Sequence, residues 1–348
     1  MRQGNGESDR PGYPMEPVWQ LLTDVSGKKR VSNLNGSGSR ASQAVTDRAN
    51  DEMQSLLDRY LDGRQPVSLD NYDWPAIRPH HVDPEVLNAL EFVTLIESNP
   101  REPASVLLAA ADRGNAPWLR RFIEQTWLPE ELMHSPPYRE YLVRSGTCDA
   151  ATIDSAIADV RERKFTLGVD YTPIEAATYG WLQELLTWRY YETIASFLVG
   201  KAQPGAPVDS VLLKILNDIA KEENFHRFIY LSGVRTSLKY APEAKEQVIR
   251  AVADFMMPGH QMVPHLQAYT SSWAKSFGFP VKKVLREISS EMIQLVGHNG
   301  LGQATIRYGA THDVPWFLKV AVLGVLPPTG LYRSPVNYLA GRLVTKLA

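Results

Sequence analysis

Two short segments of the chain place a glutamate three residues before a histidine. WLPEELMH contains Glu131 and His134, and KEENFH contains Glu223 and His226. With about 3.6 residues per helical turn, a spacing of three places both side chains on one face of a helix. Each segment therefore predicts a helix that presents a carboxylate and an imidazole to one point, and both groups are ligands for transition metals.

Each motif follows an apolar stretch that carries a further glutamate. EFVTLIESNP contains Glu97, 34 residues before Glu131, and YGWLQELLTW contains Glu184, 39 residues before Glu223. Carboxylates in apolar surroundings are costly unless positive charge compensates them. One glutamate from each of two helices and a Glu-x-x-His motif from each of two more are the pattern of a di-iron carboxylate site. The sequence therefore predicts two iron ions bound through Glu97, Glu131, His134, Glu184, Glu223 and His226.

The spacing leaves alternatives open. Glu130 and Glu222 lie four residues before the same histidines, and residues four apart also share a helix face, so either could replace its neighbour as a ligand. A single Glu-x-x-His pair is also common on solvated helix faces, where it stabilises the helix. The repetition of the whole pattern favours the metal site. His80 and His81 in RPHHVDP lack a third ligand at fitting spacing and are expected at the surface.

Helical patterns of apolar residues dominate the chain. They cover residues 42–61, 84–98, 103–113, 117–134, 137–144, 151–164, 173–199, 208–233, 243–256, 263–276, 281–298 and 314–325. Most are separated by proline or glycine, and few stretches alternate as strands do. The predicted fold class is therefore all-α, a helical bundle whose long inner helices carry the site, with additional helices packed around a di-iron core.

Composition divides the chain into three parts. Residues 1–40 are rich in Gly, Ser, Asn, Arg and Lys and are expected to be a disordered tail, 41–326 to form the domain, and 327–348 to be a C-terminal extension. A net charge of -2 gives no bulk attraction to nucleic acid. No secretion signal is expected at the N-terminus, and the stretch 314–325 is shorter than the roughly 20 apolar residues of a membrane span.

The cysteine content limits the kind of metal site. Cys148 is the single cysteine, which excludes an internal disulfide and a cysteine-based zinc or iron–sulfur site. Any metal must then be held by histidine and carboxylate. A chain with one cysteine also fits a reducing cytoplasm, which is the expected location.

At these motifs the chain resembles the soluble acyl-acyl-carrier-protein desaturases, a family of ferritin-like di-iron proteins, over about residues 85–300. WLPEELMH is similar to the family's Trp-x-x-Glu-Glu-x-x-His segment, in which the second glutamate and the histidine bind iron, so the resemblance favours Glu131 over Glu130. LIESNP is similar to Thr-Glu-x-x-Leu-Pro, although it lacks the leucine. KEENFH is similar to the segment with the last Glu-x-x-His, where Glu222 replaces the usual aspartate. FMMPGHQM resembles Met-Pro-x-His-x-Met.

The resemblance also implies an activity and a catalytic residue. YGWLQELLTW is similar to the family's Gln-Glu-x-x-Thr segment, which makes Glu184 a ligand and Thr187 the hydroxyl near the oxygen-binding side. A threonine on a helix also commonly bonds to the carbonyl of its own helix, and this alternative stays open. The implied reaction uses O2 to introduce a cis double bond into a fatty acyl chain on an acyl carrier protein. The implied assembly is a homodimer.

No nucleotide- or flavin-binding motif is visible, so the electrons are expected from a partner, and the resemblance implies ferredoxin. Because ferredoxin and acyl carrier protein are acidic, a basic surface is expected, with candidates Arg120, Arg121, Arg227, Lys282, Lys283 and Arg286. Ordinary solvated faces are the alternative for each. Ala177, Gly180 and Trp181 lie on the same helix face as Glu184, and the small residues among them predict either a substrate channel or close helix packing.

Two other functions fit the same ligands. The first is a di-iron hydroxylase or N-oxygenase that acts on a carrier-bound substrate. The second is a ferritin-like iron-handling protein without an organic substrate. The number of helices beyond a four-helix core argues against this second function.

Overall fold

The computed structural model describes residues 40–200, 208–264, 279–311, 342 and 345–346. Helices and short turns make up this part of the chain, and no strand occurs in it. The predicted all-α fold is therefore confirmed. Most of the expected tail, most of the expected helix 263–276, the whole of 314–325 and most of the extension 327–348 lie outside the described residues.

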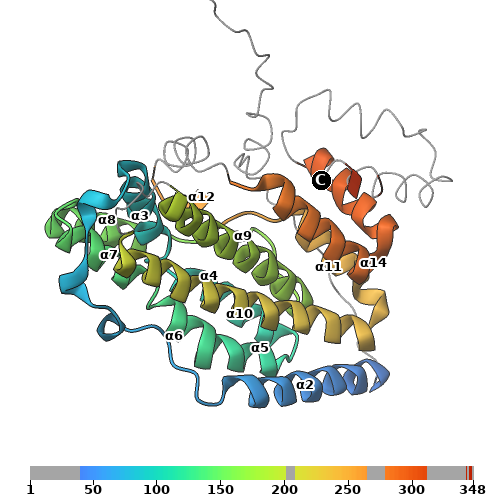
Figure 1. The fold of residues 1–348 in the computed structure, drawn as a ribbon. Helices are drawn as coiled ribbons and strands as arrows, with labels where there is room; N and C mark the ends of the chain where they lie inside the picture. Colours follow the sequence, from blue (N-terminus) through green and yellow to red (C-terminus); the bar gives the residue numbers. More distant parts are fainter. Residues whose placement is uncertain (1–39, 201–207, 265–278, 312–341, 343–344, 347–348) are drawn as a thin grey trace, which may run out of the picture.

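Two long helices form the centre of the bundle. Helix α9 (Pro173–Gly200) and helix α10 (Ser210–Tyr240) lie side by side in antiparallel directions (Figure 1). Helix α10 begins at Asp209, whose carboxylate accepts hydrogen bonds from the first free backbone amides and so caps the helix. Helix α9 buries residues on nearly all its faces, as expected for an inner helix.

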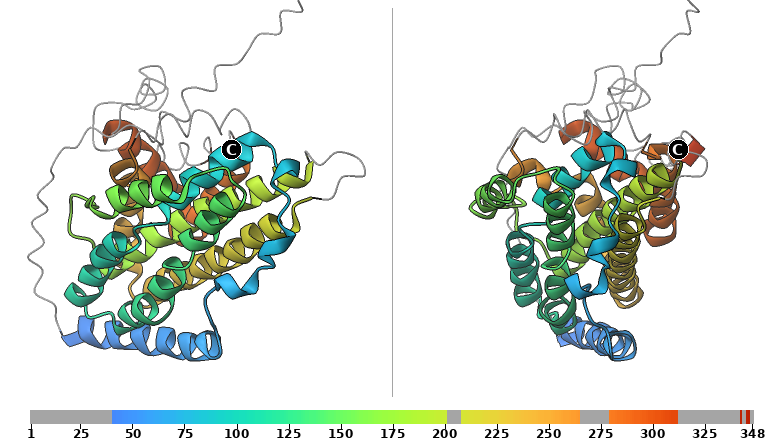
Figure 2. Two further views of the ribbon diagram at one scale, coloured as in Figure 1. Left: turned by 90° about the vertical axis from the view of Figure 1, so that its left-hand side faces the viewer. Right: turned by 60° about the vertical axis from the view of Figure 1, so that its left-hand side comes forward.

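Shorter helices cover this pair on several sides (Figures 1 and 2). Helix α2 (Arg40–Leu61) packs across α10 and α5 (Pro117–Phe122), and α4 (Arg101–Arg113) packs on α9 and α5. Helix α9 therefore has α10 and α4 as neighbours, and most of its residues are buried.

Two further groups of helices complete the described structure. At one end α3 (Pro84–Ile96) packs against α7 (Ser135–Arg144) and α8 (Ala150–Arg161). At the other, α11 (Lys245–Ala253) packs between α9 and α14 (Val281–Thr311). Helix α14 runs past the expected end at residue 298, with a break at Gly297, where a positive φ of 79° suits glycine. No described helix meets the length and apolarity that a membrane crossing needs.

The helix predicted over 117–134 is observed over 117–131, with a π-helical turn inside it and a turn at 132–134. The chain forms α5, a π-helical turn (Ile123–Trp127) and the short helix α6 (Leu128–Glu131), which ends in a turn before α7. Pro129 lies in this region, and a proline inside a helix removes an amide donor and clashes with the preceding turn. π-Helical turns are frequent at functional sites, and this one directly precedes a predicted ligand.

Candidate metal centre

The two Glu-x-x-His motifs bring their side chains together through different backbone conformations. Glu223 and His226 lie within the regular helix α10. In the first motif, Glu131 ends α6, and the backbone amide of His134 donates to the carbonyl of Glu131 at 3.2 Å. This bond closes a tight turn of about three residues, so a separation of three still brings both side chains to the same side.

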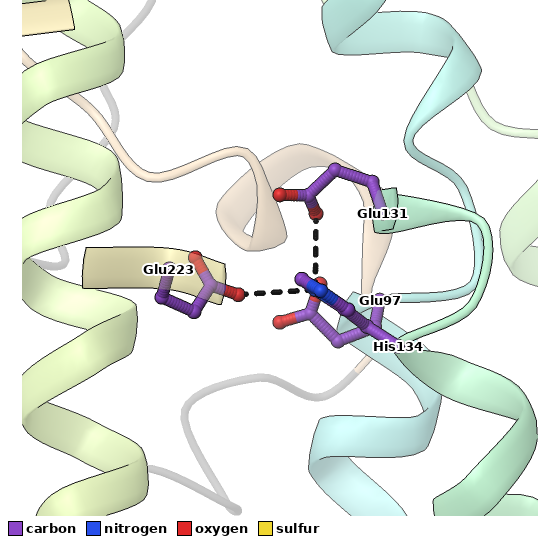
Figure 3. A group of neighbouring side chains, drawn as sticks. All are labelled: Glu97, Glu131, His134 and Glu223. Atoms are coloured by element: carbon purple, nitrogen blue, oxygen red, sulfur yellow. Dashed lines mark ion pairs between the residues drawn. The ribbon is translucent and has the colours of Figure 1, made fainter. Parts of the chain in front are cut away.

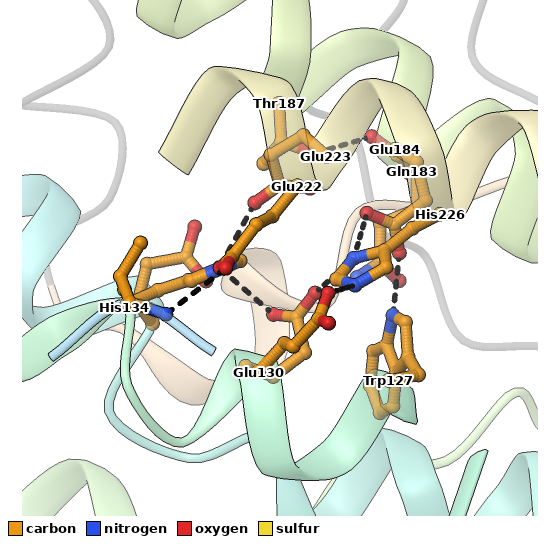
Figure 4. Close-up of polar contacts among 12 residues, drawn as sticks. Trp127, Glu130, His134, Gln183, Glu184, Thr187, Glu222, Glu223 and His226 are labelled. Atoms are coloured by element: carbon orange, nitrogen blue, oxygen red, sulfur yellow. Dashed lines mark hydrogen bonds and ion pairs between the residues drawn. The ribbon is translucent and has the colours of Figure 1, made fainter. Parts of the chain in front are cut away.

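The structure brings all six predicted ligands together in the middle of the bundle. They form two groups, and within each group one ligand atom per residue lies within 4.8 Å of the others (Figures 3 and 4). The groups are Glu97, Glu131, His134 and Glu223, and Glu131, Glu184, Glu223 and His226. Glu131 and Glu223 belong to both groups, so they are placed to bridge two metal ions.

The atoms that face the centre of this cluster lack hydrogen bonds although they are buried. They are Glu131 Oε1, His134 Nδ1, Glu184 Oε2, both carboxylate oxygens of Glu223, and His226 Nδ1. The ring nitrogen of His134 lies 3.1 Å from Glu223 Oε1, and that of His226 lies 3.2 Å from Glu131 Oε1, but neither contact has hydrogen-bond geometry. Buried polar atoms without partners are costly, and metal ions would satisfy all of them. The donor set therefore fits two metal ions.

The glutamate beside each shared ligand binds the outer nitrogen of the opposite histidine. Glu222 lies 3.0 Å from His134 Nε2, and Glu130 lies 2.8 Å from His226 Nε2. A histidine that binds metal through Nδ1 carries its proton on Nε2, so each Nε2 donates to its carboxylate. In the structure Glu131 and Glu223 face the cluster, whereas Glu130 and Glu222 contact the outer nitrogens of the histidines.

The two remaining carboxylates each accept one hydrogen bond from an aromatic residue. The hydroxyl of Tyr191, on α9, donates to Glu97 Oε1, and the indole of Trp127 donates to Glu184 Oε1 at 2.8 Å. Neither donor was predicted from the sequence. Tyr191 follows Glu184 by seven residues, two helical turns on the same face, so the helical period was a signal for it.

Burial and neighbouring charge shift the pKa values of the metal-free cluster in opposite directions. Burial, reinforced by the nearby Glu131, raises the pKa of Glu97 to about 8. Burial likewise raises the pKa of Glu223, with the charges of Glu131 and Glu184 adding to it. Burial opposes the charge of Glu131 too, but His134 and His226 outweigh it and lower its pKa to about 2. Such divergent values are typical of carboxylates and imidazoles that share one buried site.

A family model described as fatty acid desaturase matches residues 105–281, just over half of the 348 residues. The chain belongs to this fatty acid desaturase family. The fold is also similar to the X-ray structure of DesA2 from Mycobacterium tuberculosis H37Rv, described as a candidate acyl-ACP desaturase, with a TM-score of 0.51 and 19% identity over 75% of this chain and 99% of that one. No curated protein sequence is significantly similar to the chain. The expected family is confirmed.

The family match covers most of this desaturase-family site but not all of it. Five of the six clustered residues lie inside residues 105–281. Glu97 precedes the match, and its place in the cluster depends on the packing of α3 against α7. Glu97, directly after α3, was thus predicted from its apolar surroundings and is brought to the cluster by tertiary contact.

A small cavity of about 30 Å³ adjoins the cluster. Three of the clustered carboxylates line it, together with Thr187, Gln183 and the methionines Met257 and Met262 of the FMMPGHQM stretch. The hydroxyl of Thr187 donates to the backbone carbonyl of Gln183 at 2.8 Å, the helix-bonded alternative, while the residue still borders the cavity. A cavity of this size has room for about one water-sized molecule.

The small residues near Glu184 serve packing in the described structure. A side-chain carbon at Gly180 would lie 2.7 Å from the ring of Tyr230, so glycine lets that ring approach the backbone of α9. Ala177, Gly180 and Trp181 do not line the cavity beside the cluster. Of the two alternatives, close helix packing describes this face.

The other predicted surface residues differ among themselves. His80 is exposed and His81 is half-buried, and neither belongs to a potential metal-binding group of the described residues. Arg120 pairs with Asp112 and Glu124, and Arg121 pairs with Asp58, so acidic partners within the chain balance these charges. Arg227 is half-buried. Lys282 and Lys283 are exposed, as a docking surface requires.

Proposed function

We propose that this desaturase-family chain is an O2-dependent di-iron oxidoreductase that introduces a cis double bond into a fatty acyl chain on an acyl carrier protein. The observation that carries the proposal is the pair of buried four-residue groups that share Glu131 and Glu223. Carboxylate and imidazole groups in this arrangement would suit two iron ions that activate O2. The membership of the chain in the fatty acid desaturase family supports an acyl substrate.

The six clustered residues would hold the metal in two halves. Glu97 and His134 would bind one iron, Glu184 and His226 the other, and the two shared glutamates would bind both. When bound, iron reduced by the electron donor would activate O2, so that O2 can serve as the oxidant that removes hydrogen from a methylene chain. The protein residues contribute position: the carboxylates and histidines are held by hydrogen bonds from outside the cluster before any substrate arrives.

Thr187 is proposed to donate a hydrogen bond into the cavity beside the cluster, where O2 would react. It borders the cavity that reaches Glu97, Glu131 and Glu223. Its hydroxyl would have to leave the carbonyl of Gln183, to which it donates, before it could donate into the cavity. Thr187→Val should then lower turnover while leaving metal content unchanged, and Thr187→Ser should retain turnover. Equal turnover of the valine variant and the natural chain would remove Thr187 from the proposal.

The partners belong to the proposal as well. Electrons would come from ferredoxin, the enzyme would act in the cytoplasm, and the assembly would be a homodimer, as the family resemblance implies. Light scattering tests the dimer, which a molar mass of one chain across the micromolar range would exclude. Charge reversal at Lys282 and Lys283, both exposed, should weaken turnover of the carrier-bound substrate more than metal loading.

The decisive experiment measures the product. The iron-loaded protein is supplied with O2, reduced ferredoxin, ferredoxin reductase and an acyl carrier protein that carries a fatty acyl chain. A product lighter by about 2 Da indicates desaturation, whereas a gain of about 16 Da indicates hydroxylation and would replace the proposed reaction. The free fatty acid should react far less, and the double variant His134→Ala, His226→Ala should give neither product.

A further inference from the structure

Glu130 and Glu222 are potential competitors of the ligands. Each is buried, precedes a shared ligand by one residue, and lies four residues before a metal-facing histidine. A carboxylate in such a position can turn toward a metal and change the ligand set. In the structure neither does, because each is held from two sides: by the outer nitrogen of a histidine and by a second donor.

Both second donors come from one short stretch, residues 64–67. Arg64 Nε and Nη2 donate to the two oxygens of Glu130 at 3.0 and 2.8 Å. The backbone amide of Val67 donates to Glu222 Oε1 at 3.0 Å. The pairs are 66 and 155 residues apart in sequence, so a single loop joins the outer carboxylates of both motifs.

The geometry of this loop follows from its sequence. Helix α2 ends at Leu61, and Gly63 has a φ of 74°, the left-handed conformation that turns the chain out of a helix. Residues 64–68 are then non-helical, and Pro66 restricts the backbone just before the donating amide of Val67. The loop precedes residues 105–281, the region that the family model matches.

The pair of Arg64 and Glu130, here called the arginine arm, is an ordered and largely buried contact. Glu130 is 2% exposed, and the two parallel bonds from Arg64 match the planar geometry of its carboxylate. The guanidinium also stacks on the ring of Phe225, 3.6 Å from the centroid. Its outer side borders a cavity of about 370 Å³ that Arg121 also lines. Arg64 therefore links solvent to Glu130, and through it to His226.

We propose that residues 64–67 act as a clamp on both metal positions. Arg64 is a positioning residue for His226 through Glu130, and the Val67 amide is one for His134 through Glu222. By occupying the outer glutamates, the clamp leaves Glu131 and Glu223 as the ligands. The inference rests on the proposed metal centre and adds a determinant of its ligand set that lies outside the matched family region.

Metal titration tests the arginine arm without reference to turnover. Metal-free protein is titrated with Co²⁺ against a competing chelator, and its visible spectrum reports coordination. Arg64→Ala should weaken one of two Co²⁺ equivalents about 10- to 100-fold, the usual cost of losing an outer partner of a metal ligand. Arg121→Ala is the matched control: its side chain is 29% exposed against 27% for Arg64, it lines the same cavity, and it pairs with Asp58 instead of Glu130.

Chemical rescue separates position from general destabilisation. In Arg64→Ala the slot between Phe225 and Glu130 opens onto the cavity, so millimolar guanidinium should restore the weakened equivalent. Arg64→Lys, which has one point charge and no planar fork, should restore it only in part. The arginine arm is contradicted if Arg64→Ala binds Co²⁺ as tightly as the natural chain, or if Arg121→Ala loses as much Co²⁺ affinity. It is also contradicted if Arg64→Ala is folded and guanidinium does not restore its Co²⁺ affinity.

Two variants test the backbone arm. Val67→Pro removes the amide donor, whereas Val67→Ala shortens the side chain and keeps the amide. The clamp predicts that only the proline variant weakens the Co²⁺ equivalent that Arg64→Ala leaves intact. If circular dichroism shows that Val67→Pro is unfolded, replacement of Val67 by its α-hydroxy acid analogue takes its place, because the ester keeps the side chain and the contact of Glu222 with His134 and removes only the amide donor, and it must weaken that same equivalent. Normal titration of a folded variant contradicts the backbone arm.

These outcomes are independent of the catalytic proposal. If the natural chain binds two Co²⁺ equivalents and the clamp variants weaken them as described, the clamp stands even when no desaturated product forms. If the clamp variants bind metal normally while the natural chain desaturates its substrate, the clamp fails and the proposed function stands.

Discussion

The half of the centre that contains Glu97 and His134 and the half that contains Glu184 and His226 use the same ligand types but different outer partners. A phenol, Tyr191, donates to the carboxylate of the first half, and an indole, Trp127, donates to that of the second. In the first half Glu222, which contacts His134, accepts its second hydrogen bond from the neutral backbone amide of Val67. In the second half Glu130, which contacts His226, accepts hydrogen bonds from the charged guanidinium of Arg64.

This difference shows which part of a metal site repeats and which part does not. The repeated Glu-x-x-His motif places the same residue types in both halves of the cluster. The outer partners come from segments with no repeat relation, so only the His226 half has a cation at the end of its hydrogen-bond chain. Since a nearby positive charge withdraws negative charge from Glu130, we expect the two metal positions to differ in affinity.

The largest effect is expected where the halves meet. Glu131→Ala or Glu223→Ala should abolish tight binding of both metal ions, because each residue supplies an oxygen to both groups. Elemental analysis after iron loading should find no more metal than in the double variant His134→Ala, His226→Ala. Retention of one tightly bound metal ion per chain would show that the shared glutamates do not bridge.

Single histidine variants should separate the halves. His134→Ala should lose the metal position of Glu97, and His226→Ala that of Glu184, so each variant keeps about one metal ion per chain. Because the outer partners differ, the two remaining ions should differ in affinity and in the spectrum of bound Co²⁺. Identical titrations and spectra would break the comparison between the halves.

Smaller effects are expected from the aromatic donors. Tyr191→Phe removes one hydrogen bond to Glu97 and keeps the ring, and losing a bond to a charged group costs about 1.5–3 kcal/mol. The loss should appear as weaker binding at the His134 position alone. Trp127→Phe should weaken the His226 position instead, with an added loss of folding stability because a smaller ring leaves a void. Titration of Co²⁺ in each variant distinguishes the two patterns.

A pH dependence should mark the Glu97 side of the metal-free protein. The pKa of Glu97 is about 8 in the folded chain, above its ordinary value of 4.5. The contribution of Glu97 to the free energy of unfolding is therefore complete below about pH 4.5 and is lost as pH rises through 8. The free energy of unfolding should therefore fall by up to about 1.4 kcal/mol per pH unit in that window. Urea unfolding in the presence of a chelator measures it. Glu97→Gln should flatten the slope, and an unchanged slope would contradict the assignment.

Much of the site was predictable because its signals are local. The apolar helix around Glu184, the Glu-x-x-His spacing and the proline and glycine breaks all depend on neighbours within a turn or two of helix. These features indicated an all-α fold and six residues that the structure brings together. The family resemblance favoured Glu131 over Glu130, an assignment that the geometry of the cluster supports.

Other features depended on contacts between distant segments. No local pattern marks Arg64 or Val67 as partners of residues 66 and 155 positions away, because the packing of α2 and its loop creates those contacts. The filling of the space at Gly180 by Tyr230 likewise depends on a neighbouring helix. The sequence alone determined the helices and the ligand types. Tertiary packing decided which glutamates face the cluster, since neighbouring carboxylates in one motif are distinguished only by the donors that reach them from elsewhere.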